Sequence, residues 1–196
     1  MIAAVFGSKN SGKIPFAEDL CVEMGGNRYY IATMRVKTDY DKTKVEHHRK
    51  AREEKGFVTI EQDVAVVKAI DKIKWMDSLL GAKEGERTAL IASLPNLCAN
   101  EMFIIKNDDS LPEVVPHKDV ESTILCGIAL LKEYFDNIVI VSEEDPQLSY
   151  YGDIDVETLV ASGEIDGNGL NEYKEAMKEL NAAMNTLADK VYKAPF

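Results

Sequence analysis

The first 24 residues constrain the fold of this chain more than any other stretch. Residues 1–6 form a continuous apolar run, which is typical of a strand buried on both faces of a parallel sheet. Residues 7–13 read Gly-Ser-Lys-Asn-Ser-Gly-Lys, and residues 14–24 have apolar side chains at helical spacing. The pattern Gly-x4-Gly-Lys between a buried strand and a helix is that of a phosphate-binding loop. An ordinary glycine turn is the structural alternative, but the flanking strand and helix favour the nucleotide-binding interpretation.

Such a loop would bind a nucleotide, either GTP or ATP, through its backbone and one ammonium group. The N–H groups of residues 8–13 would surround a phosphate at the helix N-terminus. The side chain of Lys13 would contact the outer phosphates. The predicted cofactor-binding residues of the loop are Gly7, Ser8, Lys9, Asn10, Ser11, Gly12 and Lys13.

The residue after the loop lysine departs from the pattern. Working loops carry Ser or Thr there, and its hydroxyl ligates the Mg²⁺ that bridges the outer phosphates. Ile14 stands at this position and cannot coordinate a metal. Phosphate binding by backbone and Lys13 is compatible with this change. Phosphoryl transfer is expected to be slow, because it depends on positioning and charge neutralisation.

Length, charge and cysteine content narrow the class of protein. The chain has 196 residues, which suits a single domain over residues 1–196. A net charge of −11 disfavours nucleic acid and membrane surfaces as partners. No stretch approaches the roughly 20 apolar residues that span a bilayer, and the opening apolar run is too short for a signal peptide. The 3 cysteines show no CxxC pair, so we expect buried free thiols in a cytoplasmic protein.

Apolar runs alternate with helical patterns along the chain, which predicts an open, mostly parallel α/β sheet with helices on both faces. The predicted strands are residues 1–6, 28–34, 57–62, 87–94 and 137–144. The predicted helices are residues 14–24, 38–56, 63–81, 116–136 and 171–193. Residues 104–116 and 145–170 are expected to be loops or lids. Trp75 and Leu79 are expected in the core at helical spacing, and His117 as a structural or exposed residue.

Two of the 3 histidines, His47 and His48, are adjacent within a basic segment that also contains Arg49 and Arg52. Adjacent helix residues point about 100° apart, so the two imidazoles are not expected to share a metal. A neutral imidazole is a competent nucleophile near neutral pH, and a guanidinium group beside it could hold a phosphate. A solvated surface histidine is the structural alternative, and the residues alone leave both interpretations open.

These elements together resemble the bifunctional adenosylcobinamide kinase/adenosylcobinamide-phosphate guanylyltransferase family of cobalamin biosynthesis. The resemblance rests on the loop at residues 7–13, on "YIAT" at 30–33, on "HHR" at 47–49 and on the strand at 57–60 followed by Glu61. It covers nearly the whole chain, is strongest over residues 1–62 and is weak over 95–170. It implies a RecA-like P-loop sheet and a homo-oligomer, often a trimer, with nucleotide near subunit boundaries.

The resemblance also implies two reactions on a corrinoid substrate. A nucleoside triphosphate phosphorylates adenosylcobinamide, and GTP then forms a His–GMP intermediate from which GMP passes to the cobinamide phosphate. The catalytic residues that match are His48 for the GMP and Lys13 for the phosphates. Arg49 would steady the phosphates, and Glu61 or Asp39 would orient base or ribose.

The departures from the family pattern gather around Mg²⁺, which the family is expected to use. Ile14 replaces the loop hydroxyl, and Ala92 stands where the family carries an acidic residue, whereas Asn100 is kept. Glu143 adds a negative charge near where phosphates would lie, beside the matching Glu144. We therefore predict no metal ligands and a divergent transferase with impaired kinase activity. The alternatives are a catalytically degenerate nucleotide-binding or regulatory protein on the same scaffold, and a kinase of another small molecule.

Overall fold

The molecule is built on one six-stranded parallel sheet. The computed structural model describes residues 1–8, 10–35, 49–80, 85–104, 113–144, 161–163 and 167–194. The strand order is β3-β2-β4-β7-β1-β8, and every neighbouring pair is parallel. The strands are β1 (Ile2–Phe6), β2 (Asn27–Ala32), β3 (Phe57–Glu61), β4 (Arg87–Ala92), β7 (Asn137–Ser142) and β8 (Lys190–Lys193). The predicted open parallel sheet is therefore confirmed.

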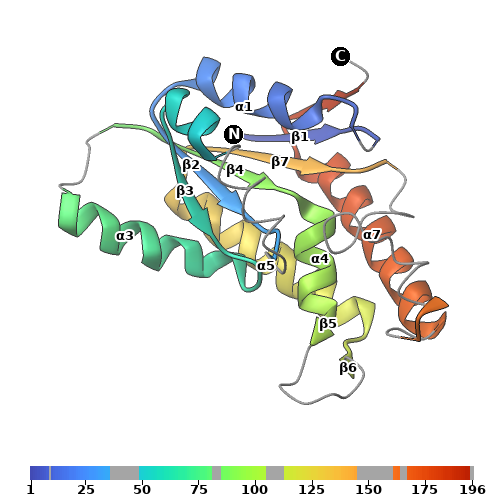
Figure 1. The fold of residues 1–196 in the computed structure, drawn as a ribbon. Helices are drawn as coiled ribbons and strands as arrows, with labels where there is room; N and C mark the ends of the chain where they lie inside the picture. The colour runs from blue at the N-terminus through green and yellow to red at the C-terminus, as the bar shows by residue number, and fades with distance from the viewer. Residues whose placement is uncertain are drawn as a thin grey trace.

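Helices cover both faces of this sheet, as predicted (Figure 1). Helix α1 (Lys13–Met24) and the helical residues 49–54 lie on one face. The opposite face carries η1 (Val66–Lys68), a short 3₁₀ turn, and α3 (Ala69–Leu80), α4 (Leu94–Met102), α5 (His117–Tyr134) and α7 (Gly167–Leu187). A small antiparallel pair, β5 (Phe103–Ile104) with β6 (Glu113–Val114), projects beyond α4.

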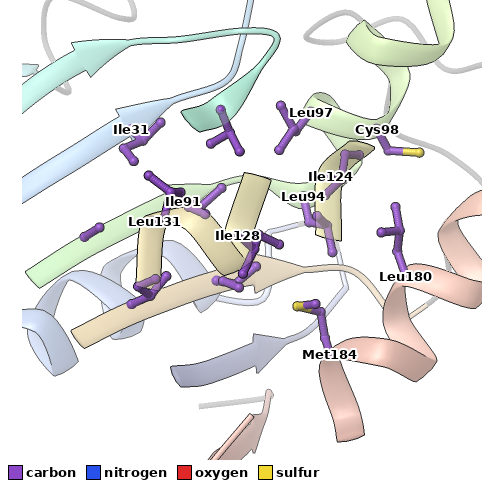
Figure 2. Close-up of a cluster of buried hydrophobic side chains, with 14 of the residues drawn as sticks. Ile31, Ile91, Leu94, Leu97, Cys98, Ile124, Ile128, Leu131, Leu180 and Met184 are labelled. Carbon is purple, nitrogen blue, oxygen red and sulfur yellow. The ribbon is translucent and has the colours of Figure 1, made fainter. Parts of the chain in front are cut away.

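Two hydrophobic clusters hold these layers together, because alternate residues of each strand point to opposite faces. In β4, Ile91 joins the larger cluster, whereas Leu90 packs on the α1 side. Because clusters cover both faces, β1 and the interior of β7 (residues 138–141) are apolar at every position. Figure 2 shows the larger cluster, with Ile31, Ile91, Leu94, Leu97, Cys98, Ile124, Ile128, Leu131, Leu180 and Met184 labelled.

The end of the chain differs from the helix predicted over residues 171–193. Helix α7 begins earlier, at Gly167, and ends at Leu187, and β8 then pairs with β1. The change of structure is fixed at Asp189, whose backbone N–H donates to the Ile2 oxygen (2.8 Å). The Asp189 carboxylate also accepts from the Ile2 N–H (2.7 Å). Residues 190–193 thus pair with the sheet as β8, although helical periodicity alone would continue the helix through them.

Helix α4 is an element that the sequence reasoning did not predict. It follows Ser93 directly, with Pro95 in its first turn. Most of its residues are buried, so it lacks the one-sided apolar stripe by which a surface helix is recognised. The predicted loop at 104–116 is interrupted by β6, and of the predicted loop at 145–170, residues 167–170 belong to α7. Residues 145–160 lie outside the described part of the chain.

The prediction that Trp75 and Leu79 belong to the core is wrong. Trp75 is 65% exposed and Leu79 is 64% exposed. The buried side of α3 is set by Ala69 and Ile73, which are one turn apart. Because successive helix residues are rotated by about 100°, Trp75 points about 200° away from Ile73.

Two further predictions concern the burial of the cysteines and the absence of a membrane-spanning segment. Cys21 and Cys98 are buried free thiols, as predicted, whereas Cys126 is exposed on α5, so that part of the prediction is wrong. Across the described ranges, none of the helices combines the length and apolar character that crossing a bilayer requires.

Candidate nucleotide-binding site

The glycine loop lies at the edge of the sheet where parallel strands end. It follows β1, whose neighbours are β7 and β8. Phe6 is in register with Ser142 on β7 and with Lys193 on β8, so the residues that follow these strands emerge side by side. In open α/β sheets, ligands bind in this crevice outside the carboxyl ends of the strands.

The backbone of the loop takes conformations that its residues suit. Asn10 has φ 62° and Gly12 has φ 82°, both in the left-handed region that Asn and Gly tolerate best. The Ser11 N–H donates to the Ser8 oxygen (3.2 Å), which closes the turn. Gly7 is required for space, since a Cβ there would lie 2.4 Å from Ser11 Oγ.

Helix α1 begins directly after the loop without a capping side chain. Gly12 is the N-cap residue, and its oxygen accepts from the Phe16 N–H (3.1 Å). No acidic residue lies in the first turn of α1. The first N–H groups of a helix have no intrahelical partners and carry partial positive charge, so this end of α1 can accept an anion.

Lys13 is buried at this helix end and forms an ion pair. Its Nζ donates to the backbone oxygen of Ser8 (2.9 Å) and to Oε1 of Glu143 (3.0 Å). The side chains of Lys13 and Glu143 are only 9% and 11% exposed. The negative charge of Glu143, which is expected near the phosphates, is therefore in direct contact with the Lys13 ammonium.

Glu143 is positioned by α7, a contact that the sequence reasoning missed. The Asn181 amide donates to the Glu143 backbone oxygen (2.8 Å), and Asn181 Oδ1 accepts from the Ser142 hydroxyl (2.6 Å). The available signal is the position of Asn181 between Met177 and Met184, at the spacing of the buried stripe of α7. A polar residue in such a stripe predicts a buried hydrogen-bond partner.

Two positions beside the loop carry side chains without the oxygen atoms that ligate Mg²⁺ in a working loop. Ile14 packs against the cluster on the α1 side, and Ala92 at the end of β4 is nearly buried in the same cluster. Neither side chain offers an oxygen atom. Among the residues that the structure describes, no group of three or more His, Cys, Asp or Glu side chains could hold a metal ion.

Glu61 lies far from the loop lysine across the sheet, and Arg49 forms an ion pair at the surface. Glu61 ends β3 at the edge of the sheet, four strand spacings from β1, or about 19 Å. Arg49 Nε pairs with Oε1 of Glu53 (3.3 Å) at the surface. Lys9 and His48, like His47 and Asp39, lie outside the described residues.

A second polar cluster lies at the ends of β2 and β4, and it has a structural role. The Thr33 hydroxyl donates to the Ser93 oxygen (2.9 Å) and accepts from the Ser93 N–H (2.7 Å). Asn100 donates its amide to the Thr33 oxygen (2.7 Å). Burial alone would raise the pKa of Asp63, but the Arg35 guanidinium, whose Nε is 2.7 Å from its carboxylate, lowers it overall. Asn100, the residue that matches the family pattern after Ala92, thus fixes the backbone after β2.

His117 is structural and partly exposed, as predicted. Its Nδ1 lies 2.8 Å from Oε2 of Glu172, and its backbone N–H donates to the same oxygen (3.0 Å). These contacts join the first turn of α5 to α7. They serve packing between the two helices on the face opposite α1.

Comparison with solved structures supports the fold. The chain is similar to a solved ATPase domain, with a TM-score of 0.50, 11% sequence identity and coverage of 98% of this chain and 68% of that chain. At this identity the likeness concerns the fold alone, and it confirms the predicted RecA-like α/β P-loop class. A search of curated proteins found no match.

Comparison with protein families gives a more specific result. Residues 3–146 match the family described as cobinamide kinase / cobinamide phosphate guanyltransferase. The matched range contains the loop, its lysine, the ends of β1 and β7, and Glu143. Because the match spans well over half of the chain, the protein belongs to this family of transferases in cobalamin biosynthesis.

Proposed function

We propose that the protein transfers GMP to a corrinoid phosphate, with the nucleotide held by residues 7–13. The observation that carries this proposal is the position of Lys13, buried at the N-terminus of α1 beside a turn with two left-handed residues. Backbone N–H groups and an ammonium at a helix N-terminus favour phosphate. Membership of the family supplies the substrate class, a cobinamide and its phosphate.

In the proposed reaction, His48 is the nucleophile and Lys13 holds the phosphates of GTP. A ring nitrogen of His48 attacks the α-phosphorus, an N–P bond forms, and the bond to the leaving pyrophosphate breaks. A phosphate oxygen of the corrinoid substrate then attacks the same phosphorus and releases the imidazole. Arg49, next in sequence to His48, would contact the phosphates, and Glu61 would orient base or ribose. The roles of His48, Arg49 and Glu61 rest on the family pattern and on the chemistry of the side chains.

The kinase half of the family activity is proposed to be impaired in this chain. Its support is the pair of side chains without oxygen atoms, Ile14 after the loop lysine and Ala92 at the end of β4. A variant with Ile14→Ser and Ala92→Asp restores both polar groups. Gain of phosphorylated cobinamide in this variant over the parent would support the proposal, and full kinase activity in the parent would contradict it.

The direct experiment is incubation with GTP labelled on the α-phosphorus. We expect acid-labile label on the parent protein and on His47→Ala, and none on His48→Ala. His47 is a matched control, because it is the same residue type in the same segment. Label on His48→Ala that disappears in His47→Ala would assign the other imidazole.

A second candidate function is nucleotide binding without turnover, which the side chains at positions 14 and 92 favour. Calorimetry of nucleotide binding, together with the labelling experiment, separates a binding protein from an enzyme. Binding of GTP or ATP with no label and no product over hours supports the binding protein. Transfer of label to cobinamide phosphate supports the enzyme.

The homo-oligomer that the family pattern implies is tested by light scattering during size-exclusion chromatography.

A further inference from the structure

We propose that Glu143 sets the affinity and charge selectivity of the loop, because its carboxylate already pairs with the Lys13 ammonium that would contact a nucleotide phosphate. The inference rests on the proposed function, in which residues 7–13 bind a nucleotide. It adds a specificity-determining residue that lies on β7's continuation rather than in the loop itself.

The Glu143 carboxylate competes with a phosphate for the Lys13 ammonium. Oε1 of Glu143 is 3.0 Å from Nζ of Lys13, and both side chains are nearly buried. An ammonium has three N–H donors, and here one points to the Ser8 oxygen and one to Glu143. A phosphate oxygen that approaches Nζ therefore meets an ammonium whose charge is already neutralised by a carboxylate in a poorly solvated position.

Glu143 is not free to withdraw with its backbone. Asn181 binds its backbone oxygen, and the adjacent Ser142 hydroxyl binds Asn181 in turn. Separation of the carboxylate from Lys13 therefore requires rotation of one of the two side chains rather than a shift of the Glu143 backbone. Glu144, the next residue, is different: it pairs with Lys193 at the surface (3.1 Å), where both side chains are well exposed.

The consequence is that binding energy depends on the charge of the phosphate chain. A like charge placed against a bound anion in a desolvated site opposes binding, and the opposition grows with the number of negative charges nearby. With Glu143 in place, the loop binds a metal-free triphosphate more weakly than a loop with an unpaired lysine would. A nucleoside without phosphate is not affected.

The test compares Glu143→Gln with Glu144→Gln by calorimetry in a metal-free buffer. Gln has the size of Glu and keeps an oxygen that can accept from Lys13, but it removes the charge. We expect Glu143→Gln to bind GTP and pyrophosphate about tenfold more tightly than the parent, the effect of removing one opposing charge at close range. GMP should gain less, and guanosine should not change. Glu144→Gln should match the parent for every ligand.

A double-mutant cycle separates the charge effect from a general change in the loop. Lys13→Met leaves the Glu143 carboxylate without its counter-ion, so it should weaken GTP binding by the parent about tenfold, and adding Glu143→Gln should restore most of that loss. Thermal unfolding of each variant reports its folding. If Glu143→Gln does not fold, carbon NMR of the Glu143 carboxylate in the parent replaces it, and its signal should move on addition of pyrophosphate but not of sodium chloride.

The outcomes distinguish this inference from the function on which it rests. Equal or weaker GTP binding by Glu143→Gln, with clear binding by the parent, overturns the role of Glu143 alone. An unchanged carboxylate signal on saturation with pyrophosphate does the same. Absence of GTP and pyrophosphate binding in both parent and Glu143→Gln overturns the proposed function and this inference with it.

Discussion

The Asn181 side chain on α7 donates a hydrogen bond of 2.8 Å to the backbone oxygen of Glu143, just beyond the end of β7. This bond connects a helix on one face of the sheet to the edge at which the glycine loop lies. The same side chain accepts from the Ser142 hydroxyl, so one residue satisfies polar groups of two consecutive positions. The backbone that carries the carboxylate facing Lys13 is therefore held by a residue 38 positions later in the chain.

Replacing Asn181 by Ala should destabilise the protein. The substitution leaves the Ser142 hydroxyl and the Glu143 carbonyl without their partner in a buried region, which costs about 1–3 kcal/mol in the free energy of unfolding. Urea denaturation measures it. Asn185→Ala is the matched control, because Asn185 is exposed one turn later on α7 and only donates to the Asn181 oxygen. Its effect should stay within about 0.5 kcal/mol, and an equal loss in both variants would contradict the role given to Asn181.

The site was predictable from sequence only where its residues are contiguous. The strand, the loop from Gly7 to Lys13 and the helix N-terminus are consecutive, and their pattern carries its own structural context. The partner of Lys13 comes from a strand end 130 positions later, and its backbone is fixed by α7. Such pairing depends on strand order, which periodicity does not specify. The charge of Glu143 was visible in the sequence, but its direct contact with the ammonium was not.

Ile73 and Trp75 should differ sharply in their contribution to stability. Ile73 is fully buried against the sheet, and its replacement by Ala should cost about 2–5 kcal/mol through lost contacts and a cavity. Trp75 is mostly exposed, so Trp75→Ala should change the free energy of unfolding by about 0.5 kcal/mol or less. Trp75 is the only tryptophan, so quenching of native fluorescence by acrylamide reports its exposure directly. Poor quenching would show that the residue is covered.

The fold was most predictable where strands are apolar on both sides. β1, β4 and β7 read as continuous apolar runs because clusters lie on both faces of the sheet, and the helices between them imply parallel pairing. Elements whose burial is uniform or whose partner is distant were missed. Helix α4 is buried on most sides, and β8 is specified by pairing with β1 rather than by its own pattern. Their assignment required the tertiary structure.

One cysteine should react in the native protein and three in the unfolded one. Burial raises the pKa of the Cys21 thiol to about 12, and burial also raises the pKa of the Cys98 thiol. A thiol held protonated and out of solvent is a poor nucleophile. Cys126 is exposed, so Ellman's reagent should modify it alone at pH 8. Cys126→Ser should abolish the native reaction, and rapid modification of that variant would contradict the burial of the other two.

The substitution Gly7→Ala should perturb the loop through a contact at the end of the chain. A Cβ at position 7 would lie 2.7 Å from the Cβ of Ala194, and Ala194 is held by its N–H bond to the Phe6 oxygen (2.8 Å). Overpacking of this kind costs about 1–3 kcal/mol. The double variant Gly7→Ala/Ala194→Gly removes that second Cβ and should recover part of the loss in a thermal unfolding measurement. No recovery would place the cost on the contact with Ser11 instead.

Glu101 should make the protein less stable as the pH rises, and Glu101→Gln should remove this dependence. Burial first, and then the nearby Asp63 carboxylate, raise the pKa of Glu101 above its ordinary value of 4.5, despite the hydrogen bond that it accepts from the Ala65 N–H. The folded state therefore binds the proton more tightly than the unfolded state. The loss of stability is absent below pH 4.5, grows as the pH rises through the folded-state pKa, and is complete above it.

Gln keeps the acceptor for Ala65 without the charge, so the stability advantage of Glu101→Gln over the parent should be present at pH 7 and vanish toward pH 4. Urea denaturation across this range measures it, and Glu23→Gln on the exposed side of α1 serves as the control. An advantage of equal size at both ends of the range would mean that the substitution acts through packing rather than through the half-buried carboxylate.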